Sequence, residues 1–119
     1  MRLEASKDQI KMARDVVAMQ LQAWECDHLV EAARVLTSEL VANAMMHGEG
    51  PIDVDVVRTD GVVRVAVTDQ GAGNPALRGV DLDDPGGMGL LIVSTMASSW
   101  GIEHPDSGGK RVWFEVDLV

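Results

Sequence analysis

The sequence has few of the residues that mark secreted, membrane-spanning or nucleic-acid-binding proteins. Its single cysteine, Cys26, can form no internal disulfide, which predicts an intracellular, cytoplasmic protein. No apolar run approaches the roughly 18 residues that cross a bilayer, and the N-terminal MRLEASKDQIKM lacks the apolar core of a signal peptide. Lysine and arginine number 10 against 19 aspartate and glutamate residues, a net charge of −9. This balance argues against nucleic acid or an anionic membrane as the main partner.

The residues that are present predict one folded domain covering residues 1–119. Hydrophobic residues make up 46% of the chain, which excludes a disordered acidic tail. The acidic balance is compatible with a metal ion or with a basic protein surface as partner.

Two segments in the first half of the chain have the apolar periodicity of helices. The first runs from about Ser6 to Trp24, and the second from Asp27 or His28 to Met46. Glycine and proline follow the second segment directly and are expected to end it.

The apolar period then changes from 3.6 to 2. Residues 52–59 and 62–68 alternate around an Asp60-Gly61 turn signal and predict a β-hairpin. Residues 112–119 predict a last strand, and Met1 to Ala5 a further strand at the sheet edge.

Between the hairpin and the last strand, residues 69–89 read as a long glycine-rich loop, a kind of segment that is usually functional or disordered. Gly89 to Trp100 is predicted to form a third helix. This order predicts an α+β fold, a two-layer α/β sandwich whose mixed, mainly antiparallel sheet is covered on one face by helices.

The first polar cluster is Glu39, Asn43 and His47 in SELVANAMMHG. Four residues advance a helix by about 400°, so the three side chains lie on nearly one face. A carboxylate and an amide one turn apart can orient a hydroxyl and ligate Mg²⁺. A solvated helix face with a satisfied buried asparagine is the alternative interpretation.

The second cluster is VAVTDQGAGNP, where a strand ends in Asp69 and two glycines, Gly71 and Gly73, alternate. A carboxylate at a strand end can accept a hydrogen bond from an exocyclic amine, and the glycines let the backbone approach a flat ring. An ordinary turn is the alternative.

The third cluster is DPGGMGLLIV, where glycines open directly into the predicted third helix. A helix N-terminus offers free N–H groups to phosphates. A linker that leads into a helix is the alternative. The spacing is neither that of a P-loop nor that of a dinucleotide-binding fingerprint.

Taken together, ExxxNAxxH, DxGxG and GxGLxxV resemble the N, G1 and G2 boxes of the GHKL ATP-binding superfamily, which has the Bergerat fold. The phrase SELVANAMMHG and the ending SWGIEHPDSGGKRVWFEVDL are most similar to the small bacterial anti-sigma serine/threonine-kinase branch. The resemblance covers nearly the whole chain and implies ATP and Mg²⁺ as cofactors.

The resemblance also implies residue roles in catalysis. Glu39 would be the general base that activates the attacking hydroxyl, and Asn43 would ligate Mg²⁺ at the phosphates. His47 matches a family position near the nucleotide. Arg14 falls where relatives carry an arginine that touches their protein partners; a solvated helix arginine is the alternative.

For the nucleotide itself, the resemblance implies that Asp69 reads the adenine amino group while Gly71 and Gly73 line the base pocket. Gly87 and Gly89 would bind phosphates.

The sequence departs from the family near the last strand. Relatives usually place a threonine that contacts the adenine region there, whereas this chain has Lys110 and Arg111. The departure bears on adenine selectivity, and a cation at this place could reach phosphate.

The resulting hypothesis is a regulatory serine/threonine protein kinase. It would phosphorylate a small anti-anti-sigma (STAS-type) protein, sequester a sigma factor, or do both, and the branch often forms homodimers. The alternative is a non-catalytic ATP-binding module that acts by sequestering its partner. A histidine-kinase fragment is disfavoured, because no dimerising helix pair with a phospho-accepting histidine precedes the domain.

Overall fold

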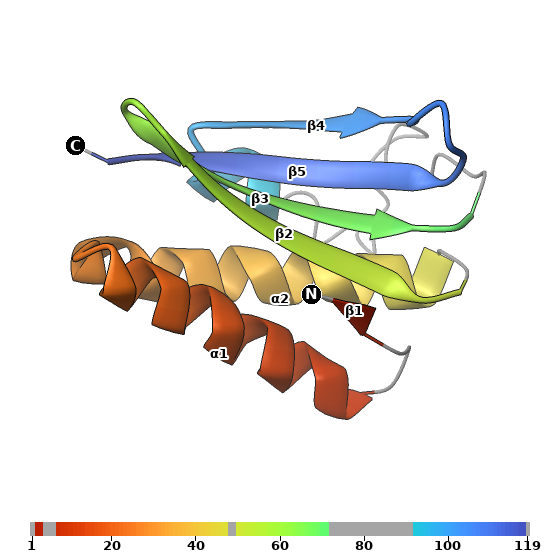
Figure 1. Ribbon diagram of the computed structural model, residues 1–119, viewed down its shortest axis with the longest axis horizontal. Coiled ribbons are helices and arrows are strands. Elements are labelled where there is room, and N and C mark those ends of the chain that lie inside the picture. Colours follow the sequence, from red (N-terminus) through yellow and green to blue (C-terminus); the bar gives the residue numbers. More distant parts are fainter. Residues whose placement is uncertain (1, 4–6, 48–49, 72–91, 119) are drawn as a thin grey trace.

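A computed structural model describes residues 2–3, 7–47, 50–71 and 92–118. Two helices lie against one face of a sheet in the order β1-β2-β3-β5-β4 (Figure 1). The predicted α+β class is confirmed. All strand pairs within the described residues are antiparallel.

Helix α1 (Lys7–Ala23) and helix α2 (Val30–His47) form the helical layer. A short 3-10 turn, Asp27–Leu29, precedes α2, so the α-helix begins slightly later than the sequence predicts. Each helix buries one stripe and exposes the rest, as its periodicity predicts. The stripes contain Ala13, Val17 and Leu21 in α1 and Ala33, Leu36, Leu40, Val41 and Ala44 in α2. No helix in the described ranges is long and apolar enough to cross a membrane.

The hairpin of β2 (Ile52–Thr59) and β3 (Val62–Asp69) confirms the prediction from the Asp60-Gly61 signal. Gly61 has a φ of 93°, a left-handed conformation that glycine adopts without strain. Strand β1 (Arg2–Leu3) pairs with the free edge of β2, which confirms an N-terminal edge strand.

The predicted third helix is wrong at its C-terminal end. Helical conformation is described for residues 92–96, whereas Ser99–Glu103 forms strand β4 beside β5 (Lys110–Asp117). Serines and Gly101 are weak helix formers, and the sheet supplies partners instead: the Ser98 amide donates to the Glu115 carbonyl at 2.8 Å. Strand β5 also begins at Lys110, earlier than predicted.

The core lies between the sheet and the helices. Alternate residues of β3 and β5 face the helical layer and pair across the two strands. Three of these pairs are apolar and the fourth is charged: Val63–Val116, Val65–Phe114, Val67–Val112 and Asp69–Lys110. The buried row therefore changes from apolar to ionic at its last position.

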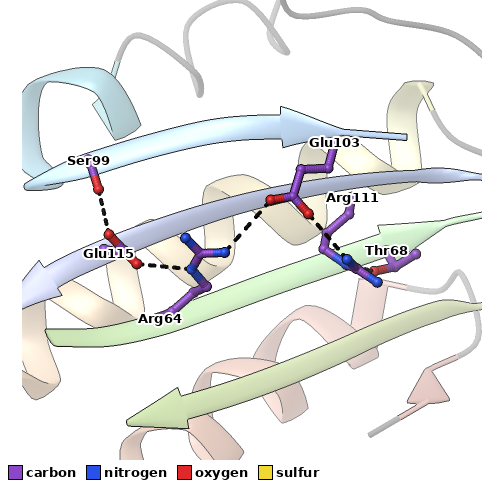
Figure 2. Close-up of polar contacts among 6 residues, drawn as sticks. All are labelled: Arg64, Thr68, Ser99, Glu103, Arg111 and Glu115. Atoms are coloured by element: carbon purple, nitrogen blue, oxygen red, sulfur yellow. Dashed lines mark hydrogen bonds and ion pairs between the residues drawn. The ribbon is translucent and has the colours of Figure 1, made fainter. Parts of the chain in front are cut away.

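The opposite face of the sheet carries a network of polar side chains (Figure 2). The Arg64 guanidinium donates to Glu115 at 3.0 Å and lies 3.7 Å from Glu103, which also accepts from Arg111 at 3.2 Å. The Ser99 hydroxyl donates to Glu115 at 2.8 Å. That bond first, and Arg64 second, hold the pKa of Glu115 below its usual value.

Candidate functional site

The polar stripe of α2 lies where the sequence predicts it. Glu39 is half-buried, and Asn43, one turn later, is only 2% exposed. The two therefore differ in access to solvent: Glu39 is partly exposed, whereas the Asn43 side chain is almost fully buried. His47 is the last residue of α2, and its side chain lies outside the described residues.

Asp69 ends β3 and is 1% exposed. Its Oδ1 accepts a hydrogen bond from the Gly71 amide at 2.8 Å, which fixes the orientation of the carboxylate. The predicted neighbours Asp69 and Gly71 thus belong to one local structure. Gly73, Gly87 and Gly89 lie outside the described residues.

Lys110 is fully buried and lies directly across from Asp69 in the ladder. Its Nζ is 3.4 Å from Asp69 Oδ2, an ion pair with almost no exposure to water. The sequence motifs place Lys110 near the base region but do not pair it with Asp69. The strict alternation from residue 110 to residue 116 was the available signal, because it puts Lys110 on the helix-facing side with Val112.

Arg111 points to the other face of the sheet. It donates to Thr68 at 3.3 Å and to Glu103 at 3.2 Å, within the network of Figure 2. The two cations that the sequence places side by side therefore have different surroundings, and among the described residues Lys110 contacts the predicted site residue Asp69 whereas Arg111 contacts Thr68 and Glu103.

The backbone at Gly109 lies very close to the backbone of Asp69, beside the Asp69–Lys110 pair. Gly109 has a φ of 84°, and a Cβ at this position would overlap with the Asp69 carbonyl oxygen. A glycine is required here for both reasons. The close approach keeps the start of β5 against the end of β3, so the positions of the two charged side chains are set by the ladder.

A groove of about 550 Å³ runs between α1 and α2, and both Arg14 and Glu39 line it. Arg14 is half-buried, and its Nε is a buried donor with no hydrogen-bond partner in the described structure. A groove lined by an arginine and a carboxylate suits a partner that brings an acceptor and a hydroxyl.

The described residues contain no cluster of three or more His, Cys, Asp or Glu side chains that could hold a metal alone. Mg²⁺ usually keeps several waters and takes one or two protein ligands together with substrate phosphates. The Asn43 amide beside Glu39 fits such a sparse ligand set. The same residues would not make a site for a tightly held structural metal.

Comparison with known proteins bears on the nucleotide and not on the metal. A search of the curated proteins finds no match to the chain. A family model described as "Histidine kinase-like ATPase domain" matches residues 3–116, nearly the whole chain, and confirms the resemblance to the GHKL-type ATP-binding superfamily. The chain therefore belongs to the family of histidine kinase-like ATPase domains, an assignment that supports ATP as its ligand.

Proposed function

We propose that the protein is an ATP-binding regulatory serine/threonine protein kinase. It phosphorylates an anti-anti-sigma (STAS-type) partner, sequesters a sigma factor, or does both. The proposal rests on one observation: Arg14 and Glu39 line the same groove. The proposed partner-contact residue therefore lies on the same surface as the proposed general base. A protein that docks along α1 and α2 can present a hydroxyl to Glu39.

In this proposal each site residue has a distinct role. The partner hydroxyl oxygen bonds to the γ-phosphorus of ATP, the bond to the bridging oxygen breaks, and ADP leaves. Glu39 accepts the hydroxyl proton, and its partial exposure lets the proton reach solvent afterwards. Asn43 would hold Mg²⁺ through its amide oxygen, and the bound ion would neutralise charge on the phosphates. Asp69 contacts the base, and positioning contributes most of the acceleration.

The direct test is transfer of labelled γ-phosphate to candidate partner proteins, with Glu39→Gln as the key variant. General bases contribute about 10²–10⁴ in rate, so transfer by Glu39→Gln should fall at least 100-fold while ATP still binds. Glu25→Gln is the matched control, because Glu25 is an exposed glutamate that is not among the residues lining the groove. ATP binding without transfer to any partner would leave the kinase proposal untenable.

The alternative is a non-catalytic module that binds ATP and acts by sequestration. The position of Arg14 in the groove favours a partner surface whether or not transfer occurs. Arg14→Ala should then weaken capture of the partner, whereas Arg58→Ala should not, because Arg58 is an exposed arginine of β2 that does not line the groove. Under this alternative Glu39→Gln leaves partner capture and regulation intact.

A further inference from the structure

The Asp69–Lys110 pair sits at the position where the proposed function puts recognition of the nucleotide base. Its two members are held rigidly, one by the Gly71 amide and the β3–β5 ladder, the other by its register at the start of β5. The pair is therefore a fixed set of polar atoms rather than a surface contact that rearranges.

The pair has unused hydrogen-bonding capacity. Asp69 Oδ2 and Lys110 Nζ are both buried, and neither makes a hydrogen bond within the described part of the chain. An ammonium has three donors and a carboxylate oxygen has free lone pairs. Burial makes each unmet group costly, so a ligand that supplies matching atoms is favoured.

A lone carboxylate and a carboxylate–ammonium pair select differently at position 6 of a purine. Adenine presents an amino group there and guanine a carbonyl oxygen. A lone carboxylate accepts a hydrogen bond from the adenine amino group and repels the guanine carbonyl oxygen. The pair is neutral overall, so it offers an acceptor to an amine and a donor to a carbonyl.

We propose that Lys110 is a specificity-determining residue that opens the base site to 6-oxopurine nucleotides, so that GTP and ITP bind beside ATP. This inference rests on the proposed role of Asp69 in base contact. Guanine adds a ring N–H for Asp69 while its carbonyl accepts from Lys110, and inosine does the same without the exocyclic amine.

The wild-type protein alone decides the proposal. Calorimetric titration with the magnesium salts of ATP, GTP and ITP should give dissociation constants within tenfold of one another. A preference for ATP above tenfold over both others overturns the inference and leaves the proposed function standing. Absence of binding by all three nucleotides refutes both.

Variants then assign the effect to Lys110. In Lys110→Thr the affinity for GTP and ITP should fall at least tenfold relative to ATP. Arg111→Met is the matched control, since Arg111 is the neighbouring cation on the opposite face, and its nucleotide ratios should equal those of wild type. An unchanged ratio in a folded Lys110→Thr protein contradicts the assignment. Should this variant not fold, the wild-type ratios still decide.

Discussion

At the scale of single residues, the charges of Asp69 and Lys110 depend on each other. Both are removed from water, and their desolvation is offset by the ion pair and by the Gly71 hydrogen bond. Removal of one partner leaves the other as an uncompensated buried charge. Asp69, which we propose to contact the base, is thus also a structural residue, and a substitution experiment must take this into account.

Asp69→Asn should therefore lower the free energy of unfolding by about 3–5 kcal/mol, because Lys110 then has no counter-charge. The double variant Asp69→Asn/Lys110→Met should recover most of this loss, since both buried charges are gone. Urea unfolding of the two variants and the wild type checks this. If the single variant were as stable as the wild type, the ion pair would not contribute to the free energy of unfolding.

At the scale of elements, strand β4, which the sequence did not predict, requires a glycine at its centre. Gly101 lies across from Trp113, and the Trp113 ring carries the Arg64 guanidinium 4.0 Å from its centre. A Cβ at Gly101 would approach the ring to 2.7 Å, closer than side chains pack. The strand therefore pairs closely with β5 because its central residue has no side chain.

Gly101→Ala should destabilise the protein by about 1–3 kcal/mol, the usual range for overpacking, because the indole must move and weakens its contact with Arg64. Chemical denaturation measures the change. In a Trp113→Leu background, with a smaller and more flexible side chain opposite, the cost of the same substitution should largely disappear. A cost that is identical in both backgrounds would contradict steric conflict with the ring as its cause.

The polar network on the open face gives the fold a pH dependence. The pKa of folded Glu115 is lowered from its ordinary value of 4.5 by Ser99 and Arg64. The ionised carboxylate thus stabilises the native state above that ordinary value, and the contribution is lost as pH falls through the lowered pKa.

Glu115→Gln should accordingly be less stable than wild type at pH 7, by about 1 kcal/mol or less for a pair open to solvent. The difference should shrink as pH falls below about 4.5, because the unfolded chain binds the proton first, and it should vanish once the folded carboxylate is protonated at its lowered pKa. Thermal unfolding of both proteins across this range tests the sign. A difference that grows on acidification would exclude this linkage.

At the scale of the whole molecule, a protein of net charge −9 has to bind an anionic nucleotide. Lys110 is neutralised by Asp69, and Arg14 belongs to the helical groove, so neither supplies a free positive field for phosphates. A cation bound with the nucleotide is therefore expected to matter more here than in a basic protein.

ATP with Mg²⁺ should stabilise the fold by mass action, by about 2.7 kcal/mol at a ligand concentration 100 times the dissociation constant. For a domain of this size this corresponds to a rise in melting temperature of roughly 10 °C. Asn43→Ala should lose the shift, and Ser38→Ala, on the same helix, should keep it. Circular dichroism must match, because Asn43 is buried. An undiminished shift in Asn43→Ala would remove its assigned role.

The sequence determined the elements whose signals are local. Amphipathic periodicity located α1 and α2, Asp60-Gly61 located the hairpin, and the spacing of the polar clusters led to the correct superfamily. Strand β4 was missed, because its apolar residues also fit a helical pattern and only pairing with β5 makes it a strand.

Tertiary structure alone decided which side chains meet. Lys110 and Arg111 are adjacent in sequence, yet one lies buried against Asp69 and the other joins the surface network. Their separation follows from the alternation of a strand, but their partners come from a register between strands 41 residues apart in the chain (Asp69 and Lys110). Likewise Arg14 and Glu39 share a groove only because α1 and α2 pack side by side. Local pattern thus predicts the elements, whereas the pairing of distant charges depends on contacts that no local pattern contains.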